Sequence, residues 1–115
     1  MRDYNLYLND IIRAIERIEN SMNNVSKEDF YKNVDIQDAI LMRINVIGEA
    51  VKSIPDDLKE KYKNIEWKKI SGMRDIISHV YFGIDFDIIW DVIKNKLPIL
   101  KKEIKLILDS GAKGF

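Results

Sequence analysis

The chain of 115 residues carries 19 basic and 19 acidic side chains, so its formal net charge of zero excludes a strong general attraction to nucleic acid. It contains no cysteine, which excludes a disulfide framework and a thiolate metal site. No apolar run approaches the roughly 18 residues that a membrane span requires, and the first residues lack the pattern of a signal peptide. We therefore expect a single domain over residues 1–115 that is soluble, cytoplasmic and not membrane-bound.

Apolar residues recur at helical spacings along most of the chain, which predicts an all-helical fold. The first helix is expected from about residue 3 to residue 22, and Ser26 with Asp29 predicts an N-cap that opens a short helical turn. The second long helix is expected to begin near Asp35, as its N-cap, and to end before Pro55. Its apolar residues cover more than one face, so it needs a second neighbour from the same chain or from a second copy.

The second half of the chain continues the helical pattern. Pro55 is expected to open a short helix that ends near residue 62, and the next helix is expected from about Glu66 to about residue 82, before a glycine. The last helix is expected from about Asp85 to about residue 109, with Gly111 beyond it and a kink at Pro98. Long amphipathic helices with short connections predict an antiparallel four- to five-helix bundle.

One segment carries residue types that can perform chemistry. The only histidine, His79, lies in Arg74-Asp75-Ile76-Ile77-Ser78-His79-Val80-Tyr81. On a helix Asp75 lies one turn before His79, whereas Arg74 lies about 140° from His79 around the axis. Arginine binds phosphate oxygens and histidine exchanges protons near neutral pH, so the pair suits phosphodiester transfer. A 2′-hydroxyl nucleophile restricts such a reaction to RNA.

The same residues also have a structural interpretation. A lone histidine among isoleucines is usually a satisfied interior or surface residue, and Arg74 would then pair with Asp75 or Asp91. Tyr81 would be a core residue with its hydroxyl at the edge, rather than a group that positions a phosphate or stacks on a base.

The segment from Gly72 to Tyr81 resembles the signature of HEPN-domain ribonucleases, in which an arginine and a polar residue precede a histidine by a short spacer. The tyrosine two residues after the histidine narrows the resemblance to HepT-like toxins. Ile47-Gly48-Glu49-Ala50 is similar to the family's second-helix motif, and the last helix, with Trp90, Leu97-Pro98 and Leu100, fits the closing helix. The resemblance covers most of the chain.

The resemblance implies a HEPN-like homodimer whose two signature helices approach across the two-fold axis and form a cleft for RNA. It implies catalytic roles for Arg74, as phosphate binder, and for His79, as general acid and base, with Asp75 and Glu49 in support. It also implies an antitoxin of the MNT type, a small nucleotidyltransferase that transfers AMP to Tyr81.

We therefore expect a metal-independent endoribonuclease toxin that needs no cofactor and is neutralised by a nucleotidyltransferase. The alternative is a non-catalytic helical module that binds a nucleotide or a nucleotidyltransferase, which the negative charge of Asp75 favours, and a plain dimerisation protein is a third interpretation. The net charge of −4 over residues 1–57 and +4 over residues 58–115 allows a basic face for phosphate on the second half. For Glu49 the alternative is a structural carboxylate paired with Arg43 or Arg13.

Overall fold

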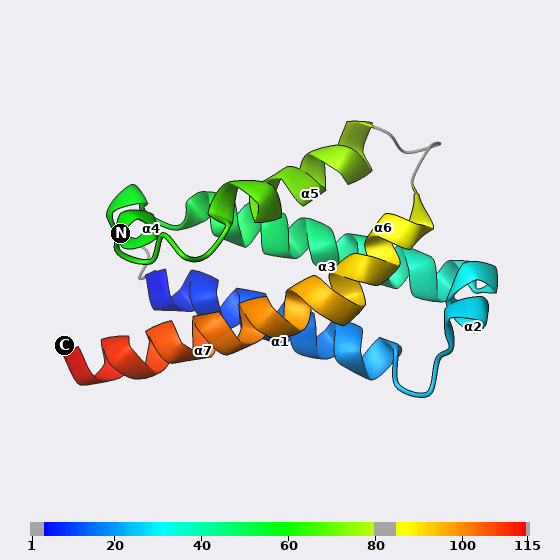
Figure 1. Cartoon of the computed structure of the whole chain (residues 1–115), viewed down its shortest axis with the longest axis horizontal. Helices are drawn as coiled ribbons and strands as arrows, with labels where there is room; N and C mark the ends of the chain where they lie inside the picture. The colour runs from blue at the N-terminus through cyan, green and yellow to red at the C-terminus, as the bar shows by residue number, and fades with distance from the viewer. Residues whose placement is uncertain (1–3, 80–84, 115) are drawn as a thin grey trace.

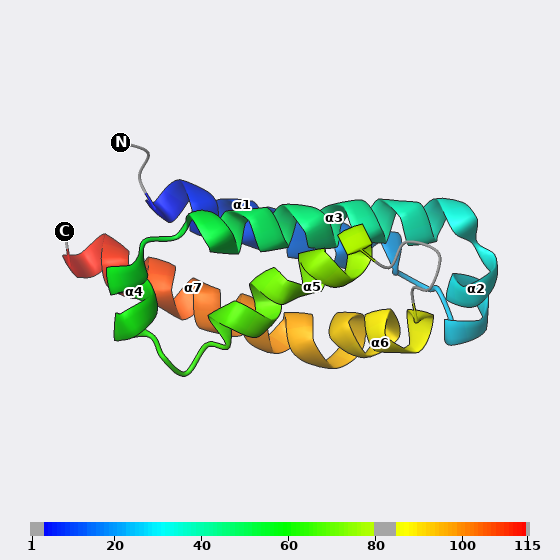
Figure 2. The same cartoon turned by 90° about the horizontal axis from the view of Figure 1, so that it is seen from above.

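The structure is a computed structural model that describes residues 4–79 and 85–114, and the side chains of residues 76–79 and 111–114 fall outside that description. Four long helical segments lie along the length of the molecule, and each runs opposite to the segment before it in the chain (Figures 1 and 2). They are α1 (Tyr4–Ser21), α3 (Val34–Ser53), α5 (Trp67–His79) and the run from α6 (Phe86–Asp91) into α7 (Leu97–Gly114). Over the described ranges the chain is helical with no strand, so the predicted all-α bundle is confirmed.

The core lies where α1, α3 and α7 meet, and the helical spacing of apolar residues explains it. The spacings of three and four residues place one stripe of each helix against its neighbours. In α1 this stripe is almost fully buried, and α3 and α7 contribute matching stripes. The buried residues of the three helices are Leu8, Ile11, Ile12, Ala14, Ile15, Ile18, Ile40, Ile44, Ile47, Ala50, Val51, Leu97, Leu100, Ile104 and Ile107.

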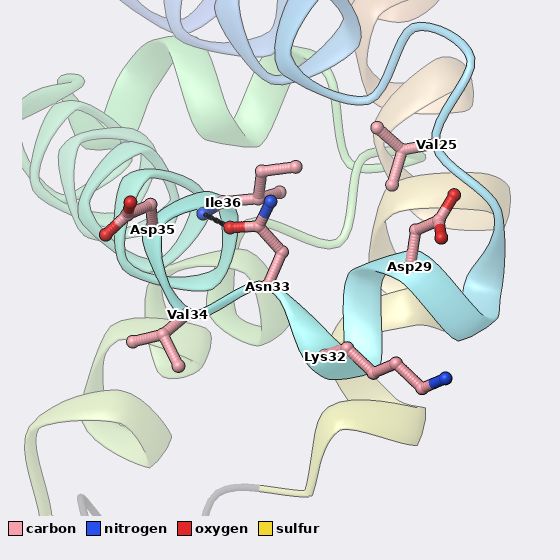
Figure 3. A pocket seen from close by; sticks show the side chains of 7 residues that line it. All are labelled: Val25, Asp29, Lys32, Asn33, Val34, Asp35 and Ile36. Atoms are coloured by element: carbon pink, nitrogen blue, oxygen red, sulfur yellow. Dashed lines mark hydrogen bonds between the residues drawn. The ribbon is translucent and has the colours of Figure 1, made fainter.

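Short helices and caps close the ends of the bundle. The predicted cap at Ser26 is confirmed, because Ser26 Oγ accepts from the Asp29 N–H at 3.0 Å and opens α2 (Lys27–Lys32). The predicted N-cap of α3 at Asp35 is wrong. Asn33 fills this role, and its Oδ1 accepts from the Ile36 N–H at 3.0 Å (Figure 3). Both residue types are good caps, and the tight exit from α2 places Asn33 at the position where the oxygen reaches that N–H.

The second half follows the prediction except at the end of the last helix. After α4 (Asp56–Lys61), the described part of α5 ends at His79, and the expected end near residue 82 lies outside the described residues. The last helix does not end near residue 109 but continues through Gly111 to Gly114. A glycine near a helix end costs only about 1 kcal/mol, so Gly111 does not by itself end the helix.

The predicted kink at Pro98 takes the form of a π-helical turn, η2 (Val92–Lys96), just before the proline. Proline donates no N–H and its ring crowds the preceding turn, so the regular pattern of hydrogen bonds cannot pass through it unchanged. The Leu97 N–H instead reaches back to the Val92 carbonyl. This wider turn lets α6 and α7 continue as one bent element.

Two further features constrain the fold. Gln37 is a buried polar residue whose Nε2 donates to the carbonyls of Phe30 at 2.9 Å and Tyr31 at 3.1 Å, which ties α2 to α3. None of the helices in the described part of the chain is long and apolar enough to span a bilayer.

Candidate functional site

The helix that carries the candidate arginine is packed tightly against α3. The contact is close at Gly48, where an ideal Cβ would lie 2.8 Å from the Cβ of Arg74 and 3.6 Å from the carbonyl oxygen of Ser71. A glycine in the middle of a helix is unfavourable by itself, so its presence is explained by this close approach. α5 therefore supplies the second neighbour that the apolar surface of α3 requires.

Arg74 lies beside Glu49 in this contact. Its Nε is 2.6 Å from Oε1 of Glu49, and the two side chains are 33% and 50% exposed. Nε itself is buried, and the direction of its N–H falls outside hydrogen-bond geometry, so the contact is an ion pair and not a complete hydrogen bond. The structural pairings considered from the sequence, Arg74 with Asp75 or Asp91 and Glu49 with Arg43 or Arg13, are thus replaced by a pairing of Arg74 with Glu49.

The charged residues near Arg74 on α5 differ in whether they form an ion pair with another described residue. Asp75, directly after the arginine, is exposed. Lys69 lies 2.6 Å from Glu66, and this contact lowers the pKa of the Glu66 carboxyl and raises that of the Lys69 ammonium, chiefly through their hydrogen bond. Lys68 is exposed beside this pair. The start of α5 therefore offers positive charge from Lys68 more freely than from Lys69.

The structure places the other predicted site residues only in part. His79 is the last described residue of α5, five residues after Arg74 on the same helix, and its side chain lies outside the described part. Tyr81 also lies outside the described residues. The structure thus brings together Arg74 and Glu49, places Asp75 beside them on the chain, and leaves the positions of the imidazole and the phenol as predictions.

Neither Arg74 nor Glu49 lines the two best-formed hollows found among the described residues. The first lies where α2 meets α3 (Figure 3), and its polar groups Asp29 and Asn33 already cap these two helices. The second is a groove of about 280 Å³ between α5 and the α6–α7 segment, with Ile70, Met73 and Ile99 in its lining. Among the described residues, no group of three acidic or histidine side chains could hold a metal ion.

The class that fold and site define is a small antiparallel helical bundle in which the helix packed against α3 carries an ion-paired arginine and a histidine. The chain belongs to the HepT-like family, described as "Ribonuclease HepT-like", which matches residues 11–107. No solved structure matches the chain.

Three relatives illustrate the similarity. A gamma-glutamylcyclotransferase and putative RNase of Methanocaldococcus jannaschii is 42% identical over 94% of this chain, and the chain spans about half of that relative's length, 49%. A putative RNase of the same organism is 41% identical over 93% of this chain and 88% of the relative. A probable ribonuclease HepT of Thermococcus cleftensis is 39% identical over 87% of this chain and 91% of the relative.

Sequence reasoning singled out the segment Gly48-Glu49 but missed what the glycine does. The available signal was a glycine inside a strongly helical pattern, which indicates that another backbone comes close. That signal does not name the partner, because the crossing point of two helices depends on the whole bundle. The ion pair was missed for the same reason, since Glu49 and Arg74 are 25 residues apart in the sequence.

Proposed function

We propose that this chain is a metal-independent endoribonuclease toxin with Arg74 and His79 as its catalytic residues. The observation that carries the proposal is the placement of Arg74. It lies on α5 in contact with Gly48 and Glu49 of α3, and five residues before the chain's only histidine. Membership of a family described as ribonuclease, and relatives named RNase, support the choice of RNA as substrate.

The proposed reaction is an internal transesterification of RNA. The 2′-oxygen attacks the adjacent phosphorus, the bond from phosphorus to the 5′-oxygen breaks, and the products are a 2′,3′-cyclic phosphate and a 5′-hydroxyl. A histidine takes the proton of the 2′-hydroxyl or delivers one to the leaving oxygen, and its usual pKa near 6.5 suits both steps. The Arg74 guanidinium stabilises the charge that develops on the phosphate oxygens. These two groups provide phosphate binding and proton transfer without a metal ion.

A homodimer is part of the proposal, because Arg74 and His79 lie on different sides of the same helix. At five residues apart, Arg74 and His79 lie about 140° from each other around α5. Within the described part of the chain, Arg74 lines neither the hollow between α2 and α3 nor the groove between α5 and the α6–α7 segment. On α3, Met42 is 63% exposed two turns before Glu49, so apolar surface is available next to the site for a second copy. Two copies of α5 that face each other would let groups from both chains meet on one phosphate.

The proposal includes control by a nucleotidyltransferase antitoxin of the MNT type. Transfer of AMP from ATP to the Tyr81 hydroxyl would release pyrophosphate and leave a bulky anion two residues after His79. A phosphate bound there would compete with RNA for Arg74 and would block access to the cleft. The family resemblance supports this step, and the presence of Tyr81 makes it possible in this chain.

A binding module without catalysis is the second candidate, and one observation favours it. Arg74 already has a carboxylate partner, and the next residue, Asp75, adds an exposed negative charge. Such a site attracts RNA phosphate less strongly than a free arginine would. A bundle of this kind would bind a nucleotide or the nucleotidyltransferase and leave RNA intact.

The deciding experiment is cleavage of RNA by the purified protein in EDTA, with wild type compared with His79→Ala and Arg74→Ala. We expect wild type to leave 2′,3′-cyclic phosphate ends and both variants to lose most of the activity while they keep the helical circular dichroism of the wild type. Equal cleavage by wild type and His79→Ala would contradict the catalytic assignment. No cleavage by a folded, dimeric wild type would favour the binding module.

A further inference from the structure

We propose that Gly48 and Glu49 are positioning residues that determine which end of the Arg74 guanidinium meets an RNA phosphate. Gly48 lets α5 approach α3 at the level of Arg74, and Glu49 places a carboxylate oxygen 2.6 Å from Nε. The two terminal nitrogens, Nη1 and Nη2, then remain for the substrate. This inference rests on the proposed function, since that function assigns the phosphate to Arg74.

The first step is the placement of the arginine stem by Gly48. An ideal Cβ on Gly48 would lie 2.8 Å from the Cβ of Arg74, where ordinary carbon contacts need roughly 3.5 Å or more. The Arg74 Cβ is bonded directly to the backbone, so no side-chain rotation moves it aside, and only a shift of α5 makes room. The distance between α3 and α5 at this level therefore depends on the absence of a side chain at Gly48.

The second step is the orientation of the guanidinium by Glu49. Nε of Arg74 is buried, so water does not reach its N–H, and Glu49 Oε1 lies 2.6 Å away. A buried N–H without an acceptor is unfavourable, and a carboxylate at this distance is the natural partner. Glu49 is half exposed, so a small rotation of its side chain is free to bring the oxygen into line with the N–H.

The consequence concerns the geometry of phosphate binding. A guanidinium has five N–H groups, one on Nε and four on the terminal nitrogens. With Nε facing Glu49, a phosphate meets the terminal pair, which donates two parallel hydrogen bonds to its oxygens. Glu49 and the RNA then bind different edges of the same group. Glu49 thus orients Arg74 for the substrate and does not compete with it.

The test combines cleavage kinetics with a measurement that needs no cleavage. For Glu49→Ala we expect kcat to fall about tenfold and KM to change less than about threefold, because orientation acts mainly in the transition state. Glu49→Gln keeps an oxygen that accepts from Nε, so we expect its kcat within about threefold of wild type. The matched controls are Glu60→Ala and Glu60→Gln, which make the same changes in the exposed ion pair of Glu60 with Lys63 and should leave both constants unchanged.

The second measurement is the NMR signal of the Arg74 Nε–H with and without a 2′-O-methyl RNA, which binds but has no nucleophile. We expect a slowly exchanging signal that survives addition of this RNA and is lost in Glu49→Ala. We also expect Gly48→Ala to lower kcat. If the Gly48→Ala variant does not fold, the Glu49 variants alone test the inference.

Two results would overturn this inference and leave the proposed function intact. They are a wild-type kcat in Glu49→Ala and loss of the protected Nε–H signal when RNA binds. A wild type that neither binds nor cleaves RNA would refute the proposed function and this inference with it.

Discussion

Gly48 and Arg74 lie so close that one added methyl group on the glycine would overlap the arginine Cβ. An ideal Cβ on Gly48 comes within 2.8 Å of that atom, whereas an ideal Cβ on Gly72, in the middle of α5, meets nothing within 4 Å. The two glycines therefore have different physical consequences. Gly48 permits a helix contact that no other residue allows, and Gly72 only weakens its helix.

This contrast predicts opposite effects of the same substitution. Gly48→Ala should destabilise the protein by about 1–2 kcal/mol, because overpacking typically costs about 1–3 kcal/mol and better helix propensity offsets part of it. Gly72→Ala should stabilise it by about 0.5–1 kcal/mol through helix propensity. Thermal unfolding followed by circular dichroism measures both, with a shift in Tm of about 4 °C for each kcal/mol. A higher Tm in both variants would mean that the close contact does not exist in solution.

Most of the fold could be predicted from the sequence, because the helical spacing of apolar residues is a local signal. The stripe of α1 and the cap at Ser26 required no knowledge of the bundle. The cap at Asn33 and the π-helical turn before Pro98 were not predicted. Asn33 and Asp35, two positions apart, compete as caps on nearly equal terms, and a proline bends a helix in several ways between which only the surrounding packing decides.

The candidate site could be predicted only as residue types on one helix. Arg74 and His79 stand out because their chemistry is specific and their spacing is short. The pairing of Arg74 with Glu49 depends on how α3 crosses α5, which local patterns do not encode. Sequence reasoning therefore named Arg74 and Glu49, but the structural alternatives that it weighed for them did not pair the two with each other.

Gln37 gives a second prediction, which concerns the junction between α2 and α3. Its Nε2 donates to two carbonyls, that of Phe30 in a buried setting and that of Tyr31 in a partly buried one. Gln37→Met keeps the size of the side chain but leaves both carbonyls without this donor, and we expect a loss of about 1–3 kcal/mol. Urea unfolding measures the loss. The control is Asn64→Ala, which removes an exposed hydrogen bond to Glu103 and should cost less than about 0.5 kcal/mol. Equal stability of Gln37→Met and wild type would mean that solvent reaches these carbonyls.

Lys101 gives a third prediction, on the pH dependence of stability. It lies 2.7 Å from Glu19 and 3.7 Å from Glu16, so it joins α7 to α1, and the hydrogen bond to Glu19 is the main reason that the pKa of Lys101 is raised above its usual 10.5. A raised pKa in the folded state means that this contribution is present below the unfolded pKa and is lost as pH rises through the folded value.

The variant Lys101→Met should therefore be less stable than wild type at about pH 8, and the difference should shrink at about pH 11, where lysine loses its charge. Urea midpoints at the two pH values measure this change. Lys102→Met, which alters an exposed neighbour on α7, should show a smaller difference at both. A gap between wild type and Lys101→Met that stays constant with pH would show that the packing of the lysine stem, and not its charge, connects the two helices.

The last prediction separates the charge of Arg74 from its shape. Arg74→Lys keeps the positive charge beside Glu49 but replaces a planar fork by a point charge. If Arg74 stabilises the phosphate in the transition state, losing one charge-assisted hydrogen bond should lower kcat/KM about 10- to 100-fold, since such a bond contributes roughly 1.5–3 kcal/mol. Initial rates on a defined RNA in EDTA measure this effect. Lys105→Arg, a change between the same two residue types at an exposed position of α7, should leave kcat/KM unchanged.

The dependence of each rate on salt makes the comparison sharper. Arg74→Lys and wild type carry the same charge, so RNA binding should weaken with salt to the same extent in both, and the loss of activity should persist at every salt concentration. If Arg74→Lys instead cleaved RNA like wild type, a point charge at this position would suffice. The fork geometry that Gly48 and Glu49 impose on Arg74 would then have no role in the reaction, even though the residue itself belongs to the site.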